Sequence, residues 1–175
     1  SSDVCSSDLN NITIQATDSV NMDQSHIVNT GKILTVYGKI NFNRTNTVSG
    51  AGSFVLASGA SLYTANANGV YSSTYLNGAV YTTTRSFNTA ANYIFTGSDS
   101  VATAGLPSTI TGNFRITNTK AVSLTGNKTV NSPGTFSVAT GAVFLFGSGL
   151  GTSVYNVNGT GNSVIEDGAT LQIPH

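Results

Sequence analysis

The sequence has little of what most functional classes depend on. It has no Trp, one Cys and one Met, and only 8% of its residues are charged, with seven acidic and seven basic side chains giving a net charge of zero. Nucleic-acid binding and polybasic membrane contacts both need an excess of Lys and Arg, so neither is expected. The single Cys excludes an internal disulfide framework. No apolar run approaches the ~20 residues of a spanning helix, so membrane insertion is not expected either.

Small polar residues take the place of the missing ones. Thr, Ser, Asn and Gly make up 85 of the 175 residues. Thr, Val, Ile, Tyr and Phe favour strands, whereas Asn and Gly favour turns. Disorder is the competing interpretation of so polar a composition, but seven Tyr, eight Phe and regular apolar spacing oppose it. The composition therefore predicts an all-β chain with many short strands.

A short motif recurs along the chain. It begins with Gly, has Gly-Ala seven and eight positions later, and ends on a large apolar residue at ten. Clear copies span 52–62, 134–144 and 161–171, and fainter ones 28–34 and 124–130. The repeat positions are Gly52, Gly59 and Leu62, then Gly134, Gly141 and Phe144, then Gly161, Gly168 and Leu171.

The spacing of the copies predicts a solenoid. The interval from Gly31 to Gly59 nearly equals the interval from Gly141 to Gly168, and the distance along the chain from Gly59 to Gly141 is close to three such steps. Each copy is expected to form a strand, a tight corner at the second Gly and a return strand. A period of this length, in the twenties, is typical of solenoids. The pattern therefore predicts a right-handed parallel β-helix of about six rungs, stacked ~4.8 Å apart.

Apolar alternation predicts further strands outside the repeat. These are Ile12–Ile14, Leu34–Val36, Ile40–Phe42, Tyr93–Phe95, Phe114–Ile116, Val122–Leu124 and Val154–Val157.

Much of the sequence resembles the β-strand repeat regions of very large secreted proteins of Bacteroidetes. The resembling segments are 52–54, 57–62, 64–69, 83–93, 95–97, 105–110, 114–118 and 122–124. Such proteins are similar in architecture to filamentous-haemagglutinin-like adhesins and commonly carry a type IX secretion signal. The resemblance implies a secreted or cell-surface location and further repeats of the same parent chain as partners. It implies no catalytic residue and no cofactor.

The two ends of the sequence look like cut edges. Residues 1–9, which include Cys5, resemble a translated sequencing adapter, and we expect them to be an artefactual tail. Residues 10–175 are then expected to be a single β-solenoid fragment of a longer protein. No signal peptide is visible, which is uninformative in a truncated chain.

A polysaccharide lyase or glycoside hydrolase is the enzymatic alternative, because some parallel β-helices have these activities. Glycoside hydrolysis needs two facing carboxylates, but the only adjacent acids, Glu166 and Asp167, would point opposite ways in a strand. They precede the corner at Gly168, so we expect them to be solvated turn acids. A lyase needs clustered acids for calcium, and the sequence offers none.

Arg85 and Asp99 are expected to form at most a structural pair across a rung. The lone interior His26 cannot build a zinc site. We therefore expect no enzyme, metal site or cofactor.

A glycan-binding β-helix module is the second alternative. Tyr63, Tyr71, Tyr75 and Tyr81 fall in the least regular stretch, and exposed aromatic rings stack on sugars. The competing interpretation is that they are half-buried strand residues with wet hydroxyls. The Gly-rich run 147–151 is expected to be a connection, because a phosphate-binding loop would need a following helix. The sequence thus favours a non-catalytic structural spacer or stalk segment of an adhesin-like protein, with surface glycans as the alternative ligands.

Overall fold

A computed structural model describes residues 11–73, 77–147 and 153–173. Within these ranges the chain forms nineteen strands and no helix. The strands are β1 (Ile12–Ile14), β2 (Ser19–Met22), β3 (His26–Ile27), β4 (Ile33–Val36), β5 (Lys39–Phe42), β6 (Val48–Leu56), β7 (Ser61–Thr64), β8 (Val80–Phe87), β9 (Asn92–Phe95), β10 (Val101–Ala102), β11 (Thr109–Ile110), β12 (Phe114–Ile116), β13 (Val122–Ser123), β14 (Lys128–Val130), β15 (Thr135–Val138), β16 (Val143–Leu145), β17 (Val157–Asn158), β18 (Asn162–Ile165) and β19 (Thr170–Gln172). The all-β prediction is confirmed for these residues.

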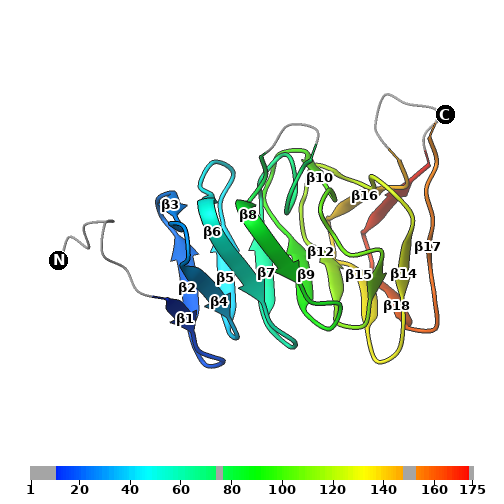
Figure 1. Cartoon of the computed structure of the whole chain (residues 1–175). Helices are drawn as coiled ribbons and strands as arrows, with labels where there is room; N and C mark the ends of the chain where they lie inside the picture. The colour runs from blue at the N-terminus through cyan, green and yellow to red at the C-terminus, as the bar shows by residue number, and fades with distance from the viewer. Residues whose placement is uncertain (1–10, 74–76, 148–152, 174–175) are drawn as a thin grey trace.

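The strands form four sheets, and every pair of named strands is parallel. The largest sheet has seven strands in the order β2-β5-β7-β9-β12-β15-β18, which is also their order in the chain. Its strands follow one another along the long axis of the molecule, from near the N-terminus to near the C-terminus (Figure 1).

The other three sheets share the remaining strands. A five-stranded sheet contains β1, β3, β4, β6 and β8, a four-stranded sheet contains β10, β13, β16 and β19, and a three-stranded sheet contains β11, β14 and β17. From β9 onward the chain visits the seven-, four- and three-stranded sheets in turn and then returns to the first. Consecutive strands therefore pair with other strands and not with each other.

The interval along the sequence between aligned residues of neighbouring strands is mostly shorter than the interval between the repeat copies. Along the seven-stranded sheet the aligned residues are Met22, Phe42, Thr64, Phe95, Ile116, Val138 and Ile165. Most of these steps are clearly shorter than the interval from Gly141 to Gly168. The two long ones, from Thr64 to Phe95 and from Val138 to Ile165, include the irregular connections around 66–79 and 147–156. The step expected from the repeat is therefore the exception, because the interval from Gly141 to Gly168 spans an insertion.

Two of the three clear repeat copies lie directly beside each other. Phe136 aligns with Ser163 between β15 and β18, and Phe144 aligns with Leu171 between β16 and β19. The sequence alignment of copies 134–144 and 161–171 thus coincides with the pairing of the strands.

The copy at 52–62 occupies a different corner. Leu62 lies on β7, whose partners lead through Tyr93 and Phe114 to Phe136, not to Phe144 as the sequence alignment implies. Gly31 likewise does not align with Gly59, because it precedes β4 whereas Gly59 follows β6, the partner of β4. The motif marks a type of corner and not a fixed position in the sheets.

The two glycine positions of the motif require glycine for different physical reasons. Gly141 and Gly168 have φ values of 72° and 77°, in the left-handed region that a Cβ disfavours. Gly134 and Gly161 lie very close to the neighbouring backbone. A Cβ added to Gly134 would overlap the carbonyl oxygen of Gly112, and a Cβ added to Gly161 would overlap the carbonyl oxygen of Gly134. The first Gly therefore permits close stacking, and the second permits the turn.

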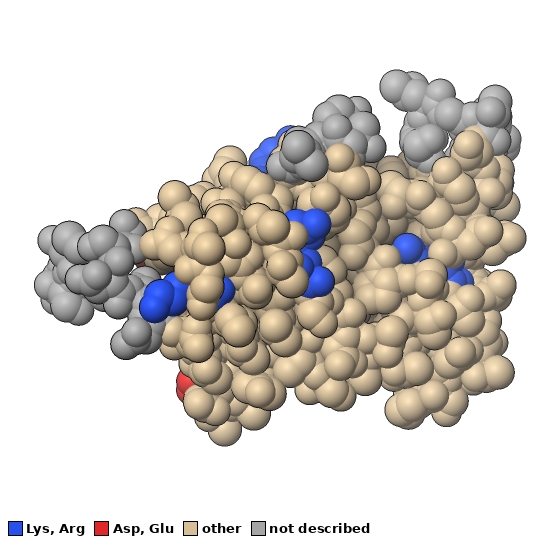
Figure 2. All heavy atoms as spheres, in the orientation of Figure 1, with Lys and Arg blue, Asp and Glu red and all other residues tan. Residues whose placement is uncertain are grey.

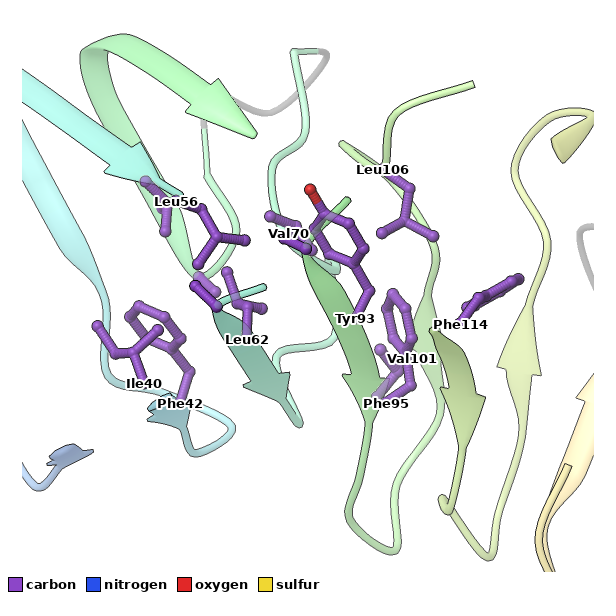
Figure 3. Close-up of a cluster of buried hydrophobic side chains, with 14 of the residues drawn as sticks. Ile40, Phe42, Leu56, Leu62, Val70, Tyr93, Phe95, Val101, Leu106 and Phe114 are labelled. Atoms are coloured by element: carbon purple, nitrogen blue, oxygen red, sulfur yellow. The ribbon is translucent and has the colours of Figure 1, made fainter. Parts of the chain in front are cut away.

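The core is a continuous row of apolar side chains along the axis. Leu62, Tyr93 and Phe114 are aligned on successive strands and have no exposed surface; Figure 3 shows them beside the buried residues of neighbouring strands. The hydroxyl of Tyr93 donates to the carbonyl of Asn88 at 2.7 Å, so its polar atom is satisfied. Burial of these side chains is the main force that stabilises the stack.

Most of the individually predicted strands are observed within a residue or so of their expected bounds. The exception is Val154–Val157, where Val154 makes an isolated antiparallel bridge to Gly147 and the strand begins at Val157. Most of the Gly-rich run at 147–151, residues 1–9 with Cys5, and Tyr75 lie outside the described residues.

Candidate functional site

The three described tyrosines among those proposed to contact glycans lie on different parts of the fold. Tyr63 lies on β7 of the seven-stranded sheet, and Tyr81 lies on β8 of the five-stranded sheet. Tyr71 is in the connection between these two strands, where the Arg85 guanidinium carbon is 3.8 Å from its ring centroid. The three described rings therefore do not form one flat stacking platform.

The acidic side chains have partners other than those expected. Asp99 pairs with Arg44 at 3.1 Å, not with Arg85. Glu166 pairs with Arg115 at 2.9 Å and accepts a hydrogen bond from the backbone N–H of Thr140 at 3.0 Å. The Thr140 N–H, and then Arg115, hold the pKa of the Glu166 carboxyl below its ordinary value. Both acids link segments of the chain that are distant in the sequence.

No cluster of three or more His, Cys, Asp or Glu side chains that could hold a metal ion occurs in residues 11–73, 77–147 and 153–173. In the same ranges there is no helix with the length and apolar character needed to cross a membrane. Figure 2 shows Lys and Arg side chains scattered over one face of a largely uncharged surface.

The outer face of the seven-stranded sheet has a shallow hollow of about 380 Å³. Its polar side chains mostly bind neighbouring strands. Asn92 Nδ2 donates to the Gly59 carbonyl and to Ser61 Oγ, both at 3.2 Å, and Asn92 Oδ1 accepts from the Asn113 N–H at 3.0 Å. These hydrogen bonds leave little for a ligand, so this hollow is structural.

A second hollow, of about 480 Å³, has a different character. Its lining includes Asn68, Tyr71, Ser72, Ser73, Thr125 and Lys128. It is formed where the connection that follows β7 comes close to the segments that follow β10 and β13. We call it the Lys128 hollow.

Lys128 is an interior lysine. It alternates with Thr129 on β14 and shares the buried face of that strand with Val130. Only 8% of its surface is exposed, and its Nζ donates to the Leu106 carbonyl at 3.1 Å. Burial lowers the pKa of its ammonium group. An ammonium in such a position normally needs compensating partners.

Sequence reasoning missed this residue, although a signal was present. Lys128 is two positions before Val130 in the faint copy 124–130, so period-2 alternation places both side chains on one face. Its charge alone suggests a solvated side chain, because lysines are almost never fully buried unless they are paired. The alternation, and not the charge, indicates that Lys128 lies on the same face of the strand as Val130.

The described residues thus form an all-β protein of parallel strands, with a buried lysine beside a polar hollow. Comparison with protein-family models, curated proteins and solved structures finds no match to this chain.

The low pKa of Lys128 makes stability depend on pH. The folded state releases this proton at a lower pH than the unfolded state, whose lysine has the ordinary pKa of 10.5. The unfolded state therefore binds more protons in that window, and the free energy of unfolding should rise as the pH rises through the folded-state pKa. Lys128→Met should remove this rise, whereas Lys120→Met, at an exposed position, should keep it.

Urea unfolding at a series of pH values measures this dependence. The series should stop below pH 10.0, the ordinary tyrosine pKa, because burial raises the pKa of Tyr93 and its ionisation on unfolding opposes the lysine effect. An identical pH dependence in wild type and Lys128→Met would contradict the assignment.

Proposed function

We propose that this chain is a non-catalytic structural spacer, a stalk segment of a secreted or cell-surface adhesin-like protein, coiled as a right-handed parallel β-helix. The observation that carries the proposal is the seven-stranded sheet, whose strands follow chain order from one end of the molecule to the other. A stack of this kind lengthens with each added strand, so it separates whatever is attached at its two ends.

The coiled path has two supports. The chain leaves the seven-stranded sheet and returns to it repeatedly, and each returning strand pairs in parallel with the one before it. Crossovers between parallel strands of one sheet are right-handed in nearly all proteins, because a twisted strand packs back onto its sheet in that sense. Six strand spacings of ~4.8 Å give an axial length of about 29 Å.

The surface composition supports the proposed location. Uncharged Ser, Thr and Asn far outnumber charged side chains. Inside the corners the same residue types satisfy backbone groups: the fully buried Asn118 donates to the carbonyls of Thr96 and Asp99 and accepts from the Lys120 N–H. The resemblance to secreted repeat regions points the same way. On this proposal the partners are further repeats of the same parent chain.

Distance measurements between spin labels test the rod. Asn21 and Val164 are outward residues at opposite ends of the seven-stranded sheet, and Asn41 is one strand closer to Val164. In a Cys5→Ser background, the pair Asn21→Cys/Val164→Cys should give a narrow distribution near ~29 Å, and Asn41→Cys/Val164→Cys one shorter by ~5 Å.

Broad distributions, or equal means for the two pairs, would refute a stiff stack. A separate sedimentation assay with insoluble neutral polysaccharides addresses function. The spacer should stay in the supernatant, whereas strong retention would favour the glycan-binding alternative.

A further inference from the structure

The Lys128 ammonium has more hydrogen-bonding capacity than the chain uses. An ammonium has three N–H donors, and the described residues provide one acceptor, the carbonyl of Leu106. The two ion pairs found among the described residues involve Arg44 and Arg115. Lys128 is therefore a buried cation without a carboxylate partner in the described part of the chain. Such a group is costly to retain unless something else neutralises it.

The hollow beside this lysine is suited to a small polar ligand. Its volume of about 480 Å³ lies within the ~300–1,000 Å³ that ligand sites usually have. Ser72, Ser73, Thr125 and Asn68 line it, and none of the described lining residues is acidic. The lining thus offers one positive charge and several neutral donors and acceptors.

One wall of the hollow is an aromatic ring held in position by a cation. The Arg85 guanidinium covers Tyr71 and also donates to the Thr82 carbonyl. This arrangement holds the ring in place. A ring at the edge of a polar site can contact the C–H groups of a sugar.

We infer that the Lys128 hollow binds a hexuronate unit, with the sugar carboxylate on Lys128 and the sugar hydroxyls on the Ser72, Ser73 and Asn68 side. The single ammonium matches a single carboxylate. The neutral polar lining matches a polyhydroxylated ring better than a phosphate, which usually requires several converging N–H groups or an Arg fork. This inference does not depend on the spacer proposal, because it concerns a local site.

Titrations of the full chain followed by ¹H–¹⁵N NMR test the inference. Sodium glucuronate is the probe, glucose lacks the carboxylate, and inorganic phosphate is an anion without the sugar. Glucuronate should shift the amide signals of residues 68–73, 102–105 and 125–128, and glucose and phosphate should bind at least about tenfold more weakly. A glucuronate trisaccharide shows whether a unit within a polymer is accepted as well as the free sugar.

Two variants assign the carboxylate contact. Lys128→Met keeps most of the side-chain volume and should weaken glucuronate binding about tenfold or more, the effect of losing a charge-assisted hydrogen bond. Lys120→Met removes the same charge at an exposed site and should bind glucuronate as the wild type does. Asn68→Ala, which leaves the lysine in place, should weaken binding by a smaller factor.

Several results would overturn the inference. They are the absence of glucuronate-dependent shifts in the wild type, shifts confined to other parts of the molecule, equal binding of phosphate and glucuronate, and unchanged binding in Lys128→Met. The wild-type shift map keeps the test decisive if Lys128→Met fails to fold. The spin-label distances remain a separate measurement, so the failure of either proposal is distinguishable from failure of the other.

Discussion

Phe114→Ala should lower the free energy of unfolding by about 3–5 kcal/mol, the range for deleting a buried phenyl ring and leaving a cavity. Phe114 has no exposed surface. Its ring centroid lies 5.9 Å from that of Phe95, 5.2 Å from that of Phe136 and 6.0 Å from that of Phe144. The substitution therefore removes three aromatic contacts that link different strands, in addition to the buried area.

Urea unfolding measured by circular dichroism gives the change. Tyr37→Ala is the control, because Tyr37 is also aromatic but 50% exposed, and it should change the free energy of unfolding by at most about 0.5 kcal/mol, as is usual for surface positions. Phe114→Leu should lower the free energy of unfolding by less than Phe114→Ala does, because leucine fills most of the cavity. Equal losses for Phe114→Ala and Tyr37→Ala would mean that the aromatic row does not form the core.

The position of Phe114 explains why so large an effect is expected from one residue. A domain stabilised by layers has no single centre; each inward side chain packs against the equivalent residues of the strands before and after it. The column through Leu62, Tyr93, Phe114 and Phe136 crosses β7, β9, β12 and β15. A cavity in the middle of this column weakens contacts on both sides of it.

Local chemistry in the sequence predicts the strands and corners well, but the sheet to which each strand belongs only in part. The copies of the motif do not mark one kind of connection between sheets. Copy 28–34 joins two strands of the five-stranded sheet, copy 52–62 leads from that sheet to the seven-stranded one, and copy 124–130 leads from the four-stranded to the three-stranded one. In the three clear copies, a left-handed Gly followed by Ala forms the corner between the two strands. Which strand then becomes the partner depends on the lengths of the connections, and the two insertions change those lengths.

The candidate site was less predictable, because it depends on contacts between distant segments. Asn68 and Tyr71 follow β7, whereas Thr125 and Lys128 lie much later in the chain, after β13. The sequence could indicate that Lys128 is inward-facing, but not that a connection with Tyr71 comes close to it. The expected pair of Arg85 and Asp99 failed for the same reason: Arg85 stacks on Tyr71, and Asp99 pairs with Arg44, which lies after β5.

The C-terminal strands of the described structure carry exposed apolar side chains. Ile165 and Leu171 are each 43% exposed, although their aligned neighbours Val138 and Phe144 are fully buried. They border a depression of about 240 Å³ that also reaches Phe136. β18 and β19 are the last strands of their sheets, so their outer backbone N–H and C=O groups are unpaired within the described structure. Such edges pair readily with other chains.

We therefore expect the isolated chain to self-associate through this end, and Leu171→Lys to raise the dissociation constant of that association about tenfold or more. Burial of a leucine side chain is worth about 1.5–3 kcal/mol, and about 1.4 kcal/mol corresponds to a factor of ten. Sedimentation velocity over a range of protein concentrations measures the constant. The lysine also introduces like charges that face each other when two copies meet at this end.

Thr170→Lys is the matched control for Leu171→Lys. Thr170 aligns with Val143, so it lies on the opposite side of β19 from Leu171 and carries the same new charge outward. It should leave the association nearly unchanged. Because Leu171 is at the end of the stack and not between two layers, Leu171→Lys should also cost far less folding stability than Phe114→Ala. A wild-type chain that stays monomeric at all concentrations, or equal effects of the two lysines, would show that the exposed apolar end does not drive association.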